Sequence, residues 1–426
     1  MNNAHTVRWI QPLSAPLNVS VAVPGSKSIT NRALLMAAFA TGTSRLSGVL
    51  QSDDTSVFTE AIQALGFHVS LDAEVGSCSV TGSGGGVPLP SASIWCGSAG
   101  TASRFLLAAV ATARGVYQMD ASAQMRSRPI GPLLESLTAQ GSIITTSEGS
   151  FPLTLEAKGL RGGRIELGHG DESSQYLSSL LMAAPMAQSP MIIETDLSVS
   201  RPYVDMTIRM MEAFGVRVER NDYQRFSVVP GVYQARDYVV EADASTASYF
   251  FGAAAVSGGT VWVPKLRRGA SLQGDLGLLS VLEQMGCVVE DGADSVRVTG
   301  PERLRGVCVD MGDISDTVMT LACVAPYADG PTTMERIGHI RLKESDRIMA
   351  VADGLQRMGI QSEIGEDFLR VFPGEPRGAV IETFDDHRIA MAFSIMGLVT
   401  PGVGISDPEC VAKTCPEFYD LLSELY

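Results

Sequence analysis

A polar residue followed by an apolar run rich in small residues recurs six times along the chain, and this repeat constrains the fold most strongly. The copies begin at intervals of 73, 73, 71, 71 and 71 residues, at Ser28, Thr101, Ser174, Ser245, Asp316 and His387. Runs such as ALLMAAFA and FLLAAVAT are apolar on every side, which is typical of helices buried all round. The repeat therefore predicts six buried helices, one in each successive unit.

A second pattern, an amphipathic segment that ends in a glycine, recurs with the same period. Its glycines are Gly66, Gly141, Gly215, Gly286 and Gly359. The first copy carries apolar residues at i, i+3, i+4 and i+7, namely Phe58, Ala61, Ile62 and Leu65. A glycine in this place is typical of a C′ cap, and the β-branched residues after it predict a strand. Each unit should therefore hold one buried helix, one amphipathic helix and several strands.

The repeat also predicts the domain organisation. Six units divide most naturally into two domains of three. We call the polar residue that begins each copy its marker. The residues before the first marker and those from the last marker onward together come close to one period. We therefore expect the N-terminal strand to complete the sixth unit. The predicted domains are residues 1–22 with 243–426, and residues 23–242. The chain then crosses twice between the two predicted domains, and such a link suggests that the domains close on a ligand.

Composition narrows the class of partner. The 426 residues are 45% apolar and 19% charged, which is typical of a soluble globular protein. The net charge of −15 argues against nucleic acid or an anionic membrane as partner, but a small anionic substrate stays possible because the sign of a pocket is local. Seven cysteines without a C-x-x-C pair, no signal-like N-terminus and no long apolar run favour a cytoplasmic protein without disulfides or structural zinc.

The repeated markers stand where helices should begin, and free N–H groups there favour anions. The flanking side chains add charge and polarity that a helix cap does not need: Lys27, Arg32, Arg104, Gln175 and Arg388. The segment around Lys27 is not a nucleotide P-loop, because Val21 and Ser26 occupy the places of its two glycines. The alternative for the polar markers is that they are only N-caps: Ser28, Thr101, Ser174 and Asp316.

Eight motifs, in order, resemble those of the 5-enolpyruvylshikimate-3-phosphate (EPSP) synthase family. They are PGSKSITNR (24–32), GSAGTASR (97–104), RSRPIGPL (126–133), DESSQYLSSLL (171–181), SRPY (200–203), RLKESDR (341–347), FDDHRIAMAF (384–393) and AKTCPEFY (412–419). The resemblance implies an α/β fold of two inside-out barrel domains, each of three βαβαββ repeats around buried helices. It also implies transfer of the enolpyruvyl group of phosphoenolpyruvate to the 5-hydroxyl of shikimate 3-phosphate by addition and elimination, without metal or organic cofactor, on the pathway to chorismate.

The resemblance also implies two sets of substrate contacts. Those to shikimate 3-phosphate are Lys27, Ser28, Arg32, Ser173, Ser174, Gln175, Ser200, Tyr203, Asp316, His339 and Lys343. Those to phosphoenolpyruvate are Lys27, Gly100, Thr101, Arg128, Gln175, Arg347, His387, Arg388 and Lys413. Arginine forks suit carboxylate and phosphate, and the missing Cβ of Gly100 lets a ligand approach the backbone.

The same resemblance implies three catalytic residues. Glu344 would protonate the methylene carbon, Asp316 would partner the 5-hydroxyl, and Lys27 would share proton transfer. Lys343 and Arg347 by themselves would lower the pKa of Glu344, so burial or a bound anion must counter them. The alternative for RLKESDRIMA is a charged helical surface with Lys343 and Arg347 at i and i+4.

Three positions depart from the family pattern: Ser98 and His339 each stand where asparagine is usual or common, and Phe105 replaces a proline of one subclass. Gly100 and Thr101 nevertheless predict ordinary inhibition by glyphosate, the family's phosphoenolpyruvate-competing inhibitor.

The related UDP-N-acetylglucosamine enolpyruvyl transferase is disfavoured, because its loop cysteine has no counterpart before Arg128. A non-catalytic or nucleic-acid-directed protein is disfavoured by the net charge of −15 and by the presence of Lys27, Asp316 and Glu344. The resemblance also implies a monomer.

Overall fold

The computed structural model of this protein describes residues 6–72, 76–168 and 173–426. The chain forms two compact units: an N-terminal unit, Gly25–Val240, and a C-terminal unit, Glu241–Tyr426 with the segment that ends at Pro24. The chain therefore passes between units after Pro24 and again after Val240. The first two residues of the motif at 171–181 lie outside the described residues.

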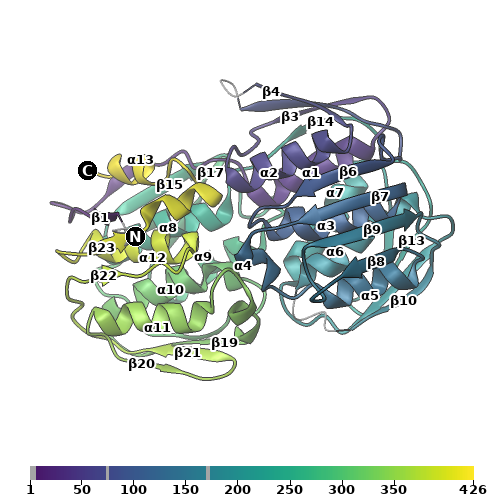
Figure 1. The fold of residues 1–426 in the computed structure, drawn as a ribbon. Helices are drawn as coiled ribbons and strands as arrows, with labels where there is room; N and C mark the ends of the chain where they lie inside the picture. The colour runs from purple at the N-terminus through teal and green to yellow at the C-terminus, as the bar shows by residue number, and fades with distance from the viewer. Residues whose placement is uncertain (1–5, 73–75, 169–172) are drawn as a thin grey trace. The chain divides into compact units, whose positions relative to one another are not determined.

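Each unit is built around three buried helices, as the repeat predicts. In the N-terminal unit they are α1 (Lys27–Phe39), α3 (Gly100–Ala111) and α6 (Ser174–Ala183), the last extended by η2 (Ala184–Met186). In the C-terminal unit they are α8 (Ala244–Ser257), α10 (Val318–Val324) between η4 (Ser315–Thr317) and η5 (Ala325–Tyr327), and α12 (His387–Gly397). All residues of α3 are buried, and within each unit these helices contact one another (Figure 1). The fifth repeat differs slightly, because its marker Asp316 lies in a 3-10 turn and the α-helix begins two residues later.

A second helix follows in each repeat. These helices are α2 (Asp53–Ala64), α5 (Gly131–Ala139), α7 (Arg201–Ala213), α9 (Leu278–Gln284, after η3, Gly274–Gly277) and α11 (Arg347–Arg357), with the shorter α13 (Phe418–Ser423) in the last repeat. All five glycines predicted as caps have positive φ, between 79° and 109°, which confirms the prediction. Phe58 and Ile62 of α2 are fully buried, so the amphipathic stripe faces inward as expected.

The N-terminal unit carries three four-stranded sheets within the described residues. Their orders are β14-β3-β5-β4, β6-β7-β9-β8 and β10-β11-β13-β12. The strands are β3 (Thr43–Ser47), β4 (His68–Asp72), β5 (Ser77–Thr81), β6 (Ser91–Trp95), β7 (Arg114–Asp120), β8 (Ile143–Thr146), β9 (Leu153–Lys158), β10 (Gly163–Leu167), β11 (Met191–Thr195), β12 (Val218–Asn221), β13 (Arg225–Val228) and β14 (Asp237–Val239). In each sheet one parallel pair is followed by an antiparallel hairpin, which is the predicted βαβαββ repeat.

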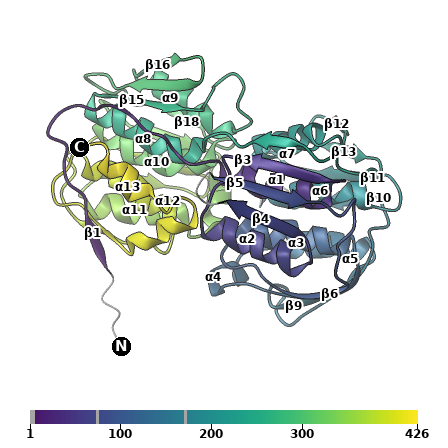
Figure 2. The same cartoon turned by 90° about the horizontal axis from the view of Figure 1, so that it is seen from above.

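The sheets place one face on the helices and the other in solvent (Figure 2). In β3, Leu46 is buried while its neighbours Arg45 and Ser47 are exposed. This alternation, with helices inside and sheets outside, confirms the predicted inside-out fold.

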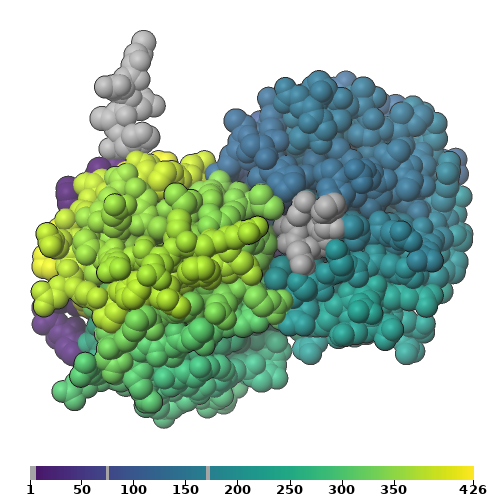
Figure 3. All heavy atoms as spheres, turned by 90° about the horizontal axis from the view of Figure 1, so that it is seen from below, coloured from purple at the N-terminus to yellow at the C-terminus, as the bar shows by residue number. Residues whose placement is uncertain are grey.

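The C-terminal unit has the same plan, and the start of the chain completes two of its sheets. Their orders are β16-β17-β15-β2, β18-β19-β21-β20 and β1-β23-β22. The strands are β1 (Val7–Trp9), β2 (Asn18–Ser20), β15 (Thr260–Pro264), β16 (Val288–Asp291), β17 (Ser295–Thr299), β18 (Cys308–Asp310), β19 (Thr332–Glu335), β20 (Ser362–Ile364), β21 (Phe368–Val371), β22 (Val380–Ile381) and β23 (Gly404–Ser406). Strand β1 pairs antiparallel with β23, and β2 pairs parallel with β15. In Figure 3 the purple atoms of the N-terminal segment accordingly lie beside the yellow C-terminal atoms.

No helix in the described ranges is long and apolar enough to span a bilayer.

Candidate active site

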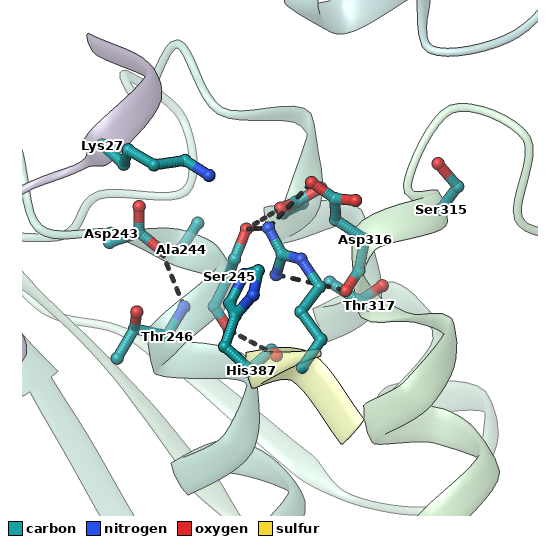
Figure 4. A network of polar contacts seen from close by, with 12 residues as sticks. Lys27, Asp243, Ala244, Ser245, Thr246, Ser315, Asp316, Thr317 and His387 are labelled. Carbon is teal, nitrogen blue, oxygen red and sulfur yellow. Dashed lines mark hydrogen bonds and ion pairs between the residues drawn. The ribbon is translucent and has the colours of Figure 1, made fainter. Parts of the chain in front are cut away.

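In the C-terminal unit, the first turns of three buried helices bring polar side chains together (Figure 4). Ser245 lies at the start of α8, Asp316 in η4 and His387 at the start of α12. The capping is done by the preceding residues: Asp243 accepts a hydrogen bond from the backbone N–H of Thr246 at 2.8 Å, and Asp386 accepts one from that of Arg388 at 3.0 Å. The marker side chains therefore point to other partners.

The N-cap alternative for the markers is wrong in both units. The residues at the cap positions are Ser26 for α1, Ala99 for α3 and Ser173 for α6, and Ile314 precedes η4. Ser28, Thr101, Ser174 and Asp316 lie inside the first turn instead.

Arg347 lies at the centre of three carboxylates. Its Nε is 2.9 Å from Oδ2 of Asp386, its Nη1 is 3.0 Å from Oδ1 of Asp316, and its Nη2 is 2.7 Å from Oε2 of Glu344. Burial alone would lower the pKa of Arg347, but the three carboxylates outweigh it and raise that pKa. This cluster excludes the charged-surface alternative, because Arg347 is 2% exposed and Lys343 lies before α11 rather than in it.

Asp316 joins a second arginine to this cluster. Its Oδ2 is 2.8 Å from Nη2 of Arg388, and the same nitrogen lies 3.4 Å from Oγ of Ser245. The Nη1 of Arg388 is 3.4 Å from Oη of Tyr249. Asp316 therefore contacts two guanidinium groups and is 21% exposed, whereas Glu344 contacts Arg347 and is 8% exposed.

His339 and Lys413 are two further predicted residues of this unit. His339, in η6 (Gly338–Leu342), places Nε2 2.9 Å from Oγ of Ser315, so the histidine that departs from the family pattern has a hydrogen-bond partner. Lys413, at the end of η7 (Pro408–Lys413), is buried. Burial raises the pKa of the Asp385 carboxyl, and the charge of Lys413 opposes this shift. Asp385 has φ of 54° and directly precedes the cap of α12, so the backbone there is strained.

In the N-terminal unit, two guanidinium groups meet at Gly100. A Cβ at Gly100 would lie 2.8 Å from Nη1 of Arg104 and 3.1 Å from Nη2 of Arg128. Both arginines are buried, and Gly100 is the first residue of α3. Two like charges beside a helix N-terminus favour an anion there. Arg104 also donates to Oε1 of Gln175 at 2.9 Å and to the carbonyl of Pro129 at 3.0 Å, so it positions both.

Lys27 and Arg32, which both belong to the motif at 24–32, have different surroundings. Lys27 places Nζ 3.2 Å from Oδ2 of Asp54 and is partly exposed. Arg32 is buried, donates to Oγ1 of Thr207 at 2.8 Å and to the carbonyl of Ser28 at 3.0 Å, and lies over the ring of Phe105. Burial lowers the pKa of Arg32 to about 10. Phe105, which departs from the family pattern, therefore packs against this cation.

Other predicted residues lie where helices of this unit begin. Ser173 caps α6 by accepting from the backbone N–H of Gln175 at 3.3 Å. Ser200 precedes α7 in the left-handed region, and the carbonyl of Tyr203 accepts from Nη2 of Arg32 at 3.3 Å. Ser98 contacts Ser122, Oγ to Oγ, at 2.8 Å. Most of the predicted residues of the N-terminal unit thus lie at or near the starts of α1, α3, α6 and α7.

The sequence reasoning missed several residues that organise these clusters: Asn31, Asp54, Asp275 and Asp386. Asn31 donates from Nδ2 to Oγ1 of Thr101 at 2.7 Å and so joins α1 to α3. Asp386 had a usable signal, because an aspartate directly before a helix marker favours the N-cap position. Asp275 had none.

The two clusters combine arginines, carboxylates and helix N-termini, which suits anionic ligands and proton transfer. Within the described ranges, no group of three or more His, Cys, Asp and Glu residues is arranged to hold a metal ion.

Comparison with known proteins gives matches over almost the whole chain. The family model described as EPSP synthase (3-phosphoshikimate 1-carboxyvinyltransferase) matches residues 12–422. A 3-phosphoshikimate 1-carboxyvinyltransferase of Nostoc sp. is 45% identical over 414 residues, which cover 96% of this chain and 97% of that protein. One from Klebsiella pneumoniae is 43% identical and covers 98% of both. The solved structure of an EPSP synthase from Acinetobacter baumannii has a TM-score of 0.84 and 27% identity, and covers 98% of both chains.

Proposed function

The chain belongs to the EPSP synthase family, and on this premise we propose how its residues carry out the reaction. The enzyme transfers the enolpyruvyl group of phosphoenolpyruvate to the 5-hydroxyl of shikimate 3-phosphate. The hydroxyl oxygen bonds to C2 while the methylene carbon gains a proton. Loss of a proton from the resulting methyl group and of phosphate from C2 then leaves the enol ether and inorganic phosphate.

The surroundings of Asp316 and Glu344 carry the proposal for acid–base chemistry. Both contact Arg347, and Asp316 also contacts Arg388. Two carboxylates in different surroundings suit opposite proton transfers. Asp316 accepts the proton of the 5-hydroxyl, Glu344 delivers one to the methylene carbon, and Lys27 shares the proton transfer.

The basic groups hold the two anionic substrates. For phosphoenolpyruvate, the convergence of Arg104 and Arg128 on Gly100 supports a site at the start of α3, with Thr101 and Gln175 beside it. The other phosphoenolpyruvate contacts that we propose are Lys27, Arg347, His387, Arg388 and Lys413.

Shikimate 3-phosphate is held by hydroxyls and cations. The proposed contacts are Lys27, Ser28, Arg32, Ser173, Ser174, Gln175, Ser200, Tyr203, Asp316, His339 and Lys343. Arg32 also orders the backbone of this site, since it donates to the carbonyls of Ser28 and Tyr203.

Phosphate release tests the function. The wild type should release phosphate from phosphoenolpyruvate with shikimate 3-phosphate and not with UDP-N-acetylglucosamine. Glu344→Gln and Asp316→Asn should each lower kcat by about 10²–10⁴-fold. Glu363→Gln is the matched control and should leave kcat unchanged. Glu363 lies on β20, is exposed and pairs with Arg370 of β21. Release with the sugar nucleotide alone, or with neither acceptor, would contradict the proposal.

Three further properties stay predictions: a cytoplasmic location, which rests on the cysteine usage, and a monomeric state and inhibition by glyphosate, which rest on the resemblance.

A further inference from the structure

Asp275 is a buried carboxylate outside all eight motifs. It lies in η3 of the C-terminal unit and is 5% exposed. Its Oδ2 accepts a hydrogen bond from Oγ of Ser245, in the first turn of α8. A buried carboxylate is costly unless other groups compensate it, so its partners indicate what it does.

The contact to Ser245 leads directly into the proposed catalytic cluster. Because the hydroxyl proton of Ser245 points to Asp275, the lone pairs of Oγ face Nη2 of Arg388, 3.4 Å away. The same Nη2 donates to Asp316 at 2.8 Å. A continuous series of polar contacts therefore runs from Asp275 through Ser245 and Arg388 to Asp316.

The charged groups around Asp275 come from three neighbouring elements. Asp243 precedes α8, Asp316 lies in η4 and Arg388 lies in α12. Burial and the nearby Asp316 raise the pKa of Asp275 to about 7, against the opposing effects of Arg388 and Ser245. The carboxyl should therefore change its charge within the pH range of ordinary enzyme assays.

We infer that Asp275 is a positioning residue whose ionised carboxylate, acting through Ser245, holds the Arg388 guanidinium against Asp316. The inference rests on the proposed function, in which Arg388 contacts phosphoenolpyruvate and Asp316 accepts a proton. When Asp275 is protonated it can donate to Ser245 itself, and the attraction for Arg388 is lost. The reactive cluster is then less well ordered.

The pH dependence of kcat/KM for phosphoenolpyruvate tests this role. In the wild type, kcat/KM should fall as the pH drops through about 7. Asp275→Asn should lower it by about 10- to 100-fold at pH 8, and the difference should shrink toward pH 6. A merely structural defect would lower it by the same factor at both pH values. An equal loss at pH 6 and 8, or activity within about twofold of wild type at pH 8, would overturn the inference.

Ser245 provides an independent pair of variants. Ser245→Ala breaks the link and should reproduce the Asp275→Asn profile. Ser245→Thr keeps a hydroxyl at this position and should restore most of the activity. If Ser245→Ala behaves like the wild type, Asp275 does not act through Ser245.

A double-mutant cycle separates this inference from the proposed function. Asp275→Asn and Arg388→Met, alone and combined, are compared by urea denaturation. Coupled effects support the contact series even if the wild type releases no phosphate, an outcome that would overturn the proposed function alone. Strictly additive effects overturn the inference, and Ser245→Ala takes the place of Asp275→Asn if that variant does not fold.

Discussion

Arg347 and Asp386 form an ion pair, Nε to Oδ2 at 2.9 Å, in which neither side chain is more than 2% exposed. Asp386 also accepts hydrogen bonds from the backbone N–H of Arg388 and from Oγ of Ser345. It therefore fixes the start of α12 and the orientation of Arg347 together. A buried charge with several fixed partners is costly to leave unpaired.

Asp386→Ala should lower the free energy of unfolding by about 3–5 kcal/mol, because it leaves the buried Arg347 without its innermost partner. Urea denaturation measures the loss. The matched control is Asp353→Ala, which removes an exposed partner of Arg357 in α11 and should cost less than about 1 kcal/mol. Equal losses in the two variants would show that Asp386 does not stabilise the cluster.

Gly100→Ala should raise the KM for phosphoenolpyruvate by about 10- to 100-fold, because the new Cβ would displace the guanidinium groups of Arg104 and Arg128. The KM for shikimate 3-phosphate should change little. Gly131→Ala is the control, since Gly131 also begins a helix and a Cβ there meets nothing within 4 Å. An unchanged phosphoenolpyruvate KM in Gly100→Ala would argue against a ligand site at this turn.

Arg32→Lys should destabilise the protein by about 2–3 kcal/mol, because an ammonium cannot reproduce the contacts of the buried guanidinium to Thr207, Ser28 and Tyr203. Thermal denaturation measures the change. Arg45→Lys, at an exposed position of β3, should have almost no effect. A similar melting temperature for all three proteins would contradict a structural role for Arg32.

Asp275→Asn should stabilise the protein more at pH 7 than at pH 4. The folded-state pKa of Asp275 is raised from 3.8 to about 7, so the folded state favours the protonated carboxyl, and this contribution is lost as the pH rises through that window. The amide does not ionise and escapes the loss. Melting temperatures across this pH range measure the difference, and Asp291→Asn, at an exposed position, should show none. A constant difference between Asp275→Asn and wild type would contradict the raised pKa.

The sequence predicted the repeat well, because each helix end depends on local chemistry. Gly66 and its four counterparts adopt positive φ, where an L side chain would be strained. Helices that are apolar on every side are stable in water only when they are buried. The pairing of β2 with β15 could not be predicted, because the repeat arithmetic assigns the N-terminal strand to the sixth unit, whereas β15 belongs to the fourth. Local propensity carries no information about such a partner.

The candidate site was predicted through its motifs rather than through its contacts. The family resemblance identified Arg347, but not the three carboxylates that surround it. Asn31 and Asp275 could not be found from spacing, since their partners Thr101 and Ser245 lie in other repeats or on other elements. Such side-chain networks depend on tertiary packing, which neither periodicity nor composition specifies.

The most direct measurement follows the carbon atoms of phosphoenolpyruvate. The wild type is incubated with phosphoenolpyruvate labelled with ¹³C at C2 and C3 and with shikimate 3-phosphate, and the products are observed by ¹³C and ³¹P NMR. An enol ether on the 5-oxygen should form together with an equal amount of inorganic phosphate. Phosphate accompanied by free pyruvate, or labelled ether only on UDP-N-acetylglucosamine, would contradict the function described for this chain.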